Sequence, residues 1–239
     1  MMESEATVLI VEDDPGLASA LKEFLDSEGF DTAVETNGER AIERILQELP
    51  AAVILDLGLP DADGFEVCRA VRPEYMGAIV MLTGSHGDND HIKGLEAGAD
   101  DYVTKPVSTP LLLARLKALI RRLEQISEVT DVSLTGIDNK KLQKGPLFID
   151  RRARETMIND DNVRLTTFEF DLLWLLARRA GTTVSRDDLY RELLDREYDG
   201  LDRTIDVHIS RLRKKLIEFG GDAEWIKTIH GKGYQFFVA

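Results

Sequence analysis

The sequence predicts two domains: an α/β domain with a five-stranded, doubly wound parallel sheet, and a smaller domain of three helices with short strands. Before residue 123, five short apolar stretches alternate with amphipathic stretches. Such alternation is typical of a parallel sheet covered by helices on both faces. After residue 146, three helical stretches lead into a hairpin pattern. At 239 residues the chain is long enough for both domains.

Each element of the first domain follows from a local pattern. Residues 53–55 are apolar throughout, as a strand buried on both faces requires. Pro15 begins the first helix and Gly29 ends it. The expected strands are 7–11, 31–35, 52–56, 78–83 and 101–104, and the expected helices are 15–28, 39–48, 64–71, 88–97 and 109–123.

Polar residues stand where these strands end: Glu12 and Asp13 after the first, Asp56 at the third, Thr83 at the fourth and Lys105 after the fifth. The carboxyl ends of parallel strands share one edge, where open α/β sheets bind ligands, so these side chains should converge. Three carboxylates there would raise each other's pKa unless a cation lies among them, and their hard oxygen atoms suit Mg²⁺. A lysine and a hydroxyl opposite could hold the oxygens of a phosphoryl group.

Composition limits the class of protein. No apolar run approaches the ~20 residues of a membrane-spanning helix, and no charged start leads into an apolar signal segment. The single cysteine, Cys68, excludes an internal disulfide and stands in a helix-like setting that favours packing. A reducing compartment suits it, so we expect a cytoplasmic protein without membrane contact.

Charge is unevenly distributed along the chain, whose formal net charge is −14. Residues 1–123 hold 11 basic and 23 acidic residues, a net charge of −12, whereas residues 146–239 hold 16 and 17, a net charge of −1. Within the second domain, residues 203–215 hold five basic residues against Asp206. For binding a polyanion, the charge of this local basic stripe matters more than the net charge of the whole chain.

Residues 6–123 resemble a response-regulator receiver domain over its full length. The matching motifs are Val11-Glu-Asp-Asp14, Asp56-Leu-Gly-Leu-Pro-Asp-Ala-Asp-Gly64, Leu82-Thr83, Gly98-Ala-Asp-Asp-Tyr102 and Lys105-Pro106. Five ordered motifs at the family's spacing make the resemblance specific. Asp14 has a simpler interpretation as the cap of the first helix, since it precedes Pro15.

The resemblance implies roles for the residues at the sheet edge. Asp56 would accept a phosphoryl group from the phosphohistidine of a cognate sensor histidine kinase. Asp13, Asp56 and the Gly58 carbonyl would bind Mg²⁺, and Glu12 would reach the ion through water. The remaining positions complete the site, namely Thr83 and Tyr102 as the switch pair and Lys105 as the phosphate partner.

The resemblance also implies a homodimer when the protein is phosphorylated. DNA-binding members usually pair their receivers through charged residues on the fourth helix, fifth strand and fifth helix. The matching residues here are Asp100, Asp101, Arg115 and Arg122. Leu111 stands where an acidic residue is usual, which predicts a weaker or more apolar pairing.

Residues 124–145 form the expected linker, because periodicity is lost and Ser, Thr, Asp, Gly and Lys gather there. A small antiparallel sheet should follow over 147–149, 155–158 and 163–165. Thr166-Thr-Phe-Glu169 forms a capping box that starts the first of three helices. The expected helices are 166–179, 185–194 and 203–219, and the hairpin over 226–238 turns at residues 230–233.

The third helix of the second domain is predicted to contact nucleic acid. Apolar residues at 205, 209, 212, 216 and 219 form a stripe that faces the core. Thr204, His208, Arg211 and Lys215 recur at the same spacing and are expected to face outward together. A charged stripe is often only a solvated face, but this mixture on the last of three helices fits a major-groove reader.

The second domain is similar to the winged-helix effector of the OmpR/PhoB family. The matching stretches are Leu165-Thr-Thr-Phe-Glu-Phe-Asp-Leu-Leu173, Val184-Ser-Arg-Asp-Asp-Leu189, Arg203-Thr-Ile-Asp-Val-His-Ile-Ser-Arg-Leu-Arg-Lys-Lys-Leu216 and Lys227-Thr-Ile-His-Gly-Lys-Gly-Tyr234. The loop over 196–202 is most similar to the RstA-type subgroup. The DNA contacts expected from the helix stripe and from this resemblance together are Arg203, Thr204, His208, Ser210, Arg211, Arg213, Lys214, Lys215, His230 and Tyr234. His230 stands at the hairpin tip where an arginine is common.

We therefore expect a transcriptional regulator that is activated by phosphorylation, binds double-stranded promoter DNA as a homodimer and meets RNA polymerase. A magnesium-dependent phosphohydrolase is the alternative enzyme, but such enzymes usually place an acid/base carboxylate two residues after the nucleophile, where Gly58 stands. We expect no enzyme beyond slow autodephosphorylation. The basic helix disfavours a phosphotransfer or protein-binding module without DNA contact. A calcium site at 61–64 is rejected because its later ligands are missing.

Overall fold

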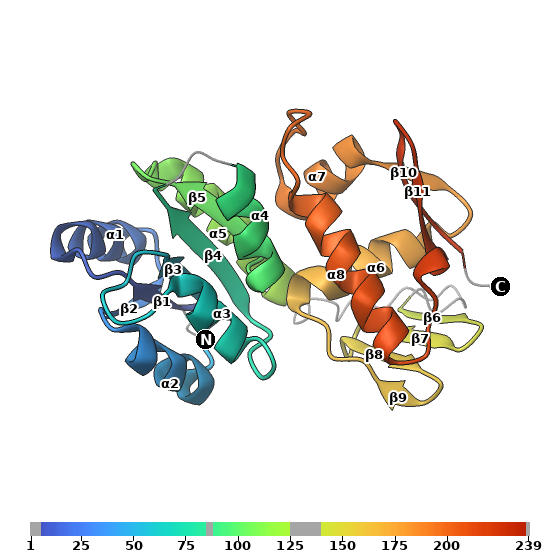
Figure 1. Cartoon of the computed structure of the whole chain (residues 1–239), viewed down its shortest axis with the longest axis horizontal. Helices are drawn as coiled ribbons and strands as arrows, with labels where there is room; N and C mark the ends of the chain where they lie inside the picture. Colours follow the sequence, from blue (N-terminus) through green and yellow to red (C-terminus); the bar gives the residue numbers. More distant parts are fainter. Residues whose placement is uncertain (1–5, 85–87, 125–139, 238–239) are drawn as a thin grey trace. The chain divides into compact units, whose positions relative to one another are not determined.

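The computed structural model describes residues 6–84, 88–124 and 140–237. The chain divides into two compact units, Met1–Ile120 and Arg121–Ala239 (Figure 1). No helix within the described ranges combines the length and apolarity needed to cross a membrane.

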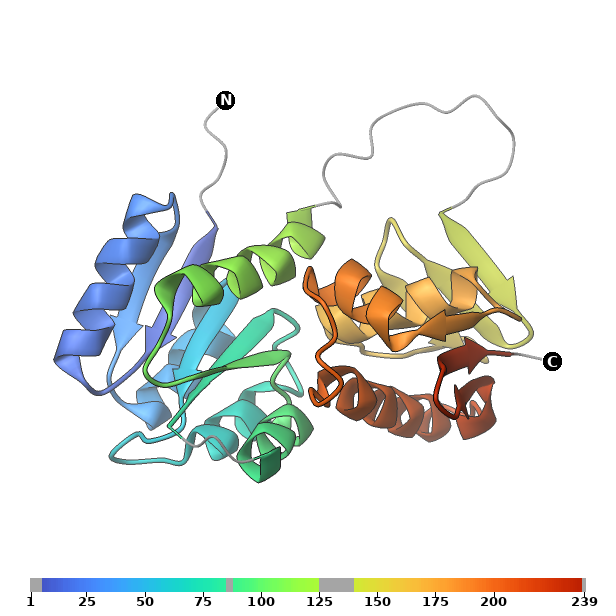
Figure 2. The ribbon, with the colours of Figure 1, turned by 90° about the horizontal axis from the view of Figure 1, so that it is seen from above.

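The first unit is a parallel sheet between two layers of helices (Figure 2). The strand order is β2-β1-β3-β4-β5, and every described pairing is parallel. The strands are β1 (Thr7–Val11), β2 (Asp31–Glu35), β3 (Ala52–Asp56), β4 (Ala78–Thr83) and β5 (Asp101–Thr104). The helices are α1 (Pro15–Ser27), α2 (Gly38–Glu48), α3 (Gly64–Val71), α4 (Asp88–Ala97) and α5 (Thr109–Glu124). The predicted five-stranded, doubly wound sheet is confirmed.

The local signals of the first unit act as expected. All five residues of β3 are buried, as a central strand covered on both faces requires. Asp14 caps α1, because its side chain accepts a hydrogen bond from the Leu17 N–H over 2.7 Å. Cys68 is buried on α3 within a cluster of apolar residues from β1, β3, β4 and α2, so its predicted packing role is confirmed.

The second unit places three helices between two small antiparallel sheets (Figure 1). One sheet has the order β6-β7-β8-β9 and the other β10-β12-β11. The strands are β6 (Lys141–Lys144), β7 (Leu147–Asp150), β8 (Glu155–Ile158), β9 (Asp161–Asn162), β10 (Thr183–Ser185), β11 (Ile226–Ile229) and β12 (Gly233–Phe236). The helices are α6 (Thr167–Arg178), α7 (Arg186–Leu194), α8 (Thr204–Glu218) and the short 3-10 helix η1 (Ala223–Trp225).

Two boundaries of the second unit differ from the prediction. Lys141–Lys144 is not linker but strand β6, which pairs with β7 across a turn at Gly145 and Pro146. This strand has one apolar residue and is largely exposed, so periodicity could not reveal it. The third strand is Asp161–Asn162 rather than 163–165. The expected linker residues 125–139 lie outside the described residues.

The C-terminal hairpin is confirmed, and it gains a strand that the sequence did not indicate. β10 pairs with β12 and joins the start of α7 to the hairpin. Gly233 makes this pairing possible, since a Cβ there would lie 2.0 Å from the Val184 carbonyl oxygen. Its φ of 153° also lies in a region that favours glycine.

Candidate functional site

Three carboxylates meet at the carboxyl edge of the first unit's sheet. One oxygen each from Glu12, Asp13 and Asp56 lies within 4.8 Å of the others. Glu12 and Asp13 follow β1, and Asp56 ends β3, the strand paired beside it. The expected convergence of these three residues is therefore confirmed. Glu12 and Asp56 are buried, whereas Asp13 is exposed, so the cluster has one open side.

Lys105 supplies a positive charge to this cluster. Its Nζ lies 2.9 Å from Glu12 Oε2 and 2.9 Å from Asp56 Oδ1. The lysine follows β5, and its backbone N–H donates to the Thr83 carbonyl oxygen over 2.6 Å, which ties it to the end of β4. The five residues predicted to converge thus lie at the ends of four neighbouring strands, β1, β3, β4 and β5.

The electrostatics fit a site that binds cations and oxyanions together. Burial raises the pKa of Glu12 above its ordinary value, the negative charge of Asp56 acts in the same direction, and Lys105 offsets only part of the shift. Burial disfavours the charge of Lys105, but its hydrogen bonds to Asp56 and Glu12 raise the pKa of the lysine overall. A divalent cation beside the carboxylates would compensate the same crowding of negative charge.

The loop after β3 brings its backbone close to Asp56. A Cβ on Gly58 would lie 3.5 Å from Asp56 Oδ2, so this glycine runs beside the carboxylate. A Cβ on Gly64 would lie 2.3 Å from the Asp56 carbonyl oxygen, so only glycine fits there. Both glycines shape the loop around the acceptor.

Asp61 is a functional-loop residue whose role the sequence did not indicate. Its two carboxylate oxygens accept hydrogen bonds from the Gly38 N–H over 2.9 Å and the Glu39 N–H over 3.1 Å, at the start of α2. These backbone donors lower the pKa of Asp61. Asp61 therefore anchors the loop to α2. The only sequence signal for this contact is that the backbone N–H groups at the start of α2 need an acceptor. Asp61 is distant from α2 in sequence, so the sequence did not connect the two.

The expected switch residues occupy neighbouring strands. Thr83 is buried at the end of β4. Tyr102 lies on β5 beside Met81 of β4. Its ring stacks on His91 of α4 with centroids 3.8 Å apart, and the Arg115 guanidinium lies 5.6 Å from the ring centroid. The stacking with His91 was not predicted, because ring contacts between separate elements leave no pattern in the sequence.

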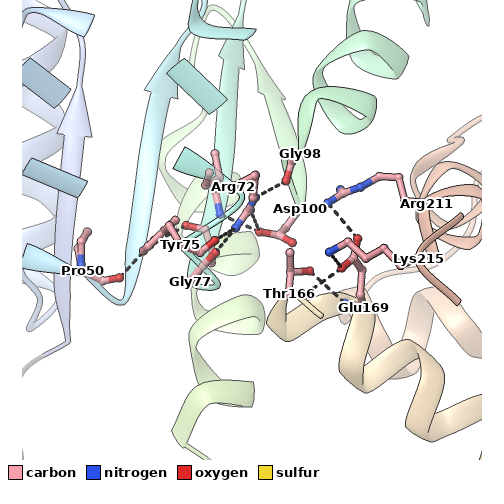
Figure 3. Close-up of polar contacts among 12 residues, drawn as sticks. Pro50, Arg72, Tyr75, Gly77, Gly98, Asp100, Thr166, Glu169, Arg211 and Lys215 are labelled. Carbon is pink, nitrogen blue, oxygen red and sulfur yellow. Dashed lines mark hydrogen bonds and ion pairs between the residues drawn. The ribbon is translucent and has the colours of Figure 1, made fainter. Parts of the chain in front are cut away.

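The charged residues expected on the pairing face are already engaged within the unit. Arg115 donates to Asp101 over 2.7 Å, and Asp101 is 1% exposed. Asp100 is also buried and pairs with Arg72, which donates as well to the carbonyl oxygens of Gly98 and Gly77 (Figure 3). Asp100 and Asp101 are therefore both buried in ion pairs and do not form part of an exposed charged surface. The side chain of Arg122 lies outside the described residues, and Leu111 is exposed on α5.

In the second unit, the expected outward stripe of α8 is wrong. Thr204 and His208 are 0% exposed, and the His208 ring stacks on Phe168 of α6 with centroids 4.0 Å apart. Arg211 and Lys215 both reach the carboxylate of Glu169, also on α6 (Figure 3). His208, Arg211 and Lys215 therefore contact α6, and Thr204 is buried with its hydroxyl donating to Asp202, so the stripe does not face solvent.

Glu169 is the physical reason for this inward orientation. It belongs to the predicted capping box, which is confirmed: the Thr166 N–H donates to Glu169 Oε2 over 2.9 Å and the Glu169 N–H to Thr166 Oγ1 over 3.2 Å. The carboxylate is fully buried and binds Lys215 Nζ at 2.6 Å and Arg211 Nη2 at 3.0 Å. Burial alone would raise its pKa, but these two cations and the hydrogen bonds outweigh burial and lower the pKa of Glu169 to about 2.

A different face of α8 is open to solvent. Arg203, Ser210, Lys214 and Ile217 are exposed. Their spacings of seven, four and three residues place them on one side of the helix. Arg203 is oriented by Asp206, whose Oδ2 lies 3.0 Å from its Nη1. We call Arg203, Ser210 and Lys214 the exposed row of α8.

The other expected DNA contacts, in and beside the hairpin, also include both structural and exposed residues. Arg213 donates through Nε to the Ile226 carbonyl oxygen over 2.9 Å and through Nη2 to Thr228 Oγ1 over 3.0 Å, so it fastens β11 to α8. Tyr234 is 3% exposed and donates to Asp206. These two expected DNA contacts therefore hold the hairpin in place. His230 is exposed at the turn between β11 and β12, as predicted.

Comparison with known proteins agrees with both halves of this description. A family described as the response regulator receiver domain matches residues 8–117, and one described as transcriptional regulatory protein, C terminal, matches residues 160–236. The chain is 41% identical over 231 residues to transcriptional regulatory protein RstA of Escherichia coli (strain K12), covering 96% of this chain and 97% of RstA. It is 37% identical over 227 residues to CpxR of the same organism, covering 95% and 96%. A solved structure of a RitR mutant has the same fold, with a TM-score of 0.73 at 24% identity, covering 98% of this chain and 100% of that chain.

Proposed function

The chain belongs to the response regulators of the OmpR/PhoB type, and from this membership we propose that it is a phosphorylation-controlled transcriptional regulator. Asp56 is the proposed acceptor of a phosphoryl group from the phosphohistidine of a sensor histidine kinase. The observation that carries this proposal is the position of the Asp56 carboxylate between an acidic pair and the Lys105 ammonium, 2.9 Å away.

The geometry supports a simple transfer step. The Asp56 carboxylate attacks the phosphorus of the phosphohistidine, a P–O bond forms, and the P–N bond breaks to release the imidazole. Lys105 lies where it can contact the new phosphoryl oxygens, and Thr83 ends the adjacent strand. Glu12, Asp13, Asp56 and the Gly58 carbonyl would hold Mg²⁺, which supplies charge neutralisation during transfer. Gly58 offers no carboxylate to activate water, so only slow autodephosphorylation is proposed, not a separate enzymatic activity.

The second unit is proposed to bind double-stranded promoter DNA in the cytoplasm. The exposed row of α8 offers a guanidinium, a hydroxyl and an ammonium group, and His230 offers an imidazole at the hairpin tip. An exposed basic helix face can enter the major groove, and a hairpin tip can contact the neighbouring backbone. Arg211 and His208 are assigned instead to holding α8 against α6.

The proposed activated form is a homodimer that meets RNA polymerase at the promoter. Leu111 is exposed on α5 and gives the expected pairing face an apolar component. The ion pair between Arg115 and the buried Asp101 joins α5 to β5, two of the elements expected at this face. Sedimentation with and without a phosphoryl mimic tests the dimer, and an unchanged monomer across micromolar concentrations would contradict it.

Phosphoryl acceptance is tested by weighing the intact protein after incubation with acetyl phosphate and Mg²⁺. The wild type should gain the mass of one phosphoryl group, and Asp56→Asn should gain none. Asp63→Asn is the matched control, because Asp63 lies in the same loop and caps α3, and asparagine caps helices equally well. This control should be labelled like the wild type, and chelation of Mg²⁺ should abolish labelling. Equal labelling of Asp56→Asn would refute the assignment.

A further inference from the structure

A pocket of about 130 Å³ lies in the second unit, away from the exposed row of α8. Its walls come from the β7–β8 turn, α6 and α7, and no residue of α8 or of the hairpin lines it. The polar lining residues are Arg151, Asp171, Trp174, Arg178 and Glu192. The proposed DNA contacts leave this pocket without a role.

Two buried polar atoms at the pocket lack a hydrogen-bond partner in the described structure. Trp174 is 5% exposed, and its indole Nε1 has no acceptor. Asp171 binds Arg154 through Oδ1 at 2.9 Å, but its buried Oδ2 has no donor. Buried donors and acceptors normally have partners, so one N–H group and one carboxylate oxygen are left for a ligand.

The charges around these two atoms leave a positive surplus. Asp171 is paired with Arg154, and Glu192 is paired with Arg179 at 2.6 Å. Arg151 and Arg178 are exposed, and the described residues place no carboxylate within ion-pair distance of either. The Arg151 guanidinium lies 5.7 Å from the centroid of the Trp174 ring, so one unpaired cation stands over the indole.

The pocket is larger than one water molecule. At about 30 Å³ per water molecule, 130 Å³ has room for about four waters. The pocket can therefore accept a short side chain with its polar end group.

We propose that this pocket binds an acidic residue of a protein partner. The partner's carboxylate would accept hydrogen bonds from the Trp174 indole N–H and the Arg178 guanidinium, with Arg151 as a second cation. A backbone N–H of the same segment would donate to Asp171 Oδ2. A nucleic-acid phosphate fits less well, because it offers only acceptors and would face the Asp171 carboxylate without a donor.

The binding test uses the full chain labelled with ¹⁵N-tryptophan, followed by NMR of its indole N–H groups. The chain has two tryptophans, so Trp225 of η1 is an internal control for Trp174. The probe is a blocked tetrapeptide with two central glutamates. It should move the Trp174 signal to saturation and leave the Trp225 signal in place. The same peptide with glutamines should bind at least about ten-fold more weakly, which corresponds to about 1.4 kcal/mol.

Two variants and a second probe decide the outcome. Arg178→Gln should weaken the glutamate peptide about ten-fold, whereas Arg191→Gln, exposed on α7 outside the pocket, should bind it like the wild type. Trp174→Phe assigns the signal. The proposal is overturned if the Trp174 signal does not move, if both peptides or inorganic phosphate move it equally, or if Arg178→Gln binds normally. DNA binding by Arg178→Gln should be unchanged, so this proposal can fail while the proposed function stands.

Discussion

The edge of the receiver sheet and the exposed row of α8 are both proposed to meet phosphate groups, but their side chains are positioned by different means. At the sheet edge, strand pairing brings Glu12, Asp56 and Lys105 together, because adjacent parallel strands end at the same place. On α8, each side chain's direction depends on how the helix is rotated against α6. One buried carboxylate, Glu169, sets that rotation by binding Arg211 and Lys215.

Burial raises the pKa of both carboxylates, but their charged neighbours give them opposite net shifts. Glu12 faces another carboxylate and one lysine, and its pKa is raised. Glu169 faces two cations, and its pKa is lowered to about 2. The negative charges near Glu12 remain only partly compensated, at a site proposed to bind a cation. The charge of Glu169 is compensated by two cations of the same unit, which stabilises the fold.

The largest expected effect is the loss of stability in Glu169→Gln. Removing this charge leaves Arg211 and Lys215 without their buried partner, so the second unit should lose about 3 kcal/mol of unfolding free energy, the lower end for a broken buried pair. Urea denaturation measures the loss. Glu218→Gln is the control, since that residue is exposed and forms no ion pair among the described residues. A loss below 1 kcal/mol, roughly the value of a surface pair, would show that Glu169 does not set the rotation of α8.

Acid should change the contributions of Glu169 and Glu12 to stability in opposite directions. The pKa of Glu169 is about 2 in the fold and 4.5 ordinarily, so its contribution is complete above pH 4.5 and is lost as the pH falls toward 2. Between pH 5 and pH 3 this carboxylate should cost the second unit about 2 kcal/mol. Glu12 has a raised pKa, so the folded receiver takes up its proton more readily than the unfolded chain, and acidification relieves this site.

Denaturation followed separately in each unit checks the pH prediction. The acid sensitivity of the second unit should largely disappear in Glu169→Gln. If the mutant keeps the wild-type slope between pH 5 and pH 3, other carboxylates are responsible. If the receiver of Glu12→Gln responded to acid like the wild-type receiver, Glu12 would not contribute to the pH dependence of receiver stability.

Arg211→Ala should reduce stability rather than alter base preference. Its guanidinium binds Glu169 within the unit, so its loss should cost about 1.5 kcal/mol, the lower value for a hydrogen bond to a charged group. At temperatures where the variant remains folded, its ratio of affinities for cognate and scrambled duplexes should match the wild type. If the variant bound cognate and scrambled duplexes with nearly equal affinity, Arg211 would be a base-contacting residue after all.

The smallest effect on stability is expected for Lys214→Ala. Lys214 is exposed, so the unfolding free energy should change by no more than about 0.5 kcal/mol. Its ammonium is expected to meet a phosphate, and the log–log salt dependence of DNA binding should flatten by about one unit for all sequences alike. Fluorescence titrations at several salt concentrations give the slope. An unchanged slope would mean that the exposed row does not lie along the backbone.

The sequence was sufficient for the receiver site because its geometry follows from topology. Five alternating strands and helices fix which ends lie together, and the polar residues at 12, 13, 56 and 105 stand at those ends. For α8, the 3.6-residue period defines the angles between side chains but not which row faces solvent. That choice depends on Glu169, which is 35 or more residues away in sequence. Strand β6 was not predicted because it has one apolar residue and is largely exposed. The pocket at Trp174 was not predicted because it depends on contacts between segments that are distant in sequence.

The separation of two rows on α8 also has a consequence for protein engineering. The clamp formed by Glu169, Arg211 and Lys215 holds the helix without using the exposed row. A library randomised at Arg203, Ser210 and Lys214 would therefore vary the surface offered to a duplex while the scaffold stays folded. Natural divergence can use the same freedom, because new operator preferences can arise at these positions without compensating changes in the core.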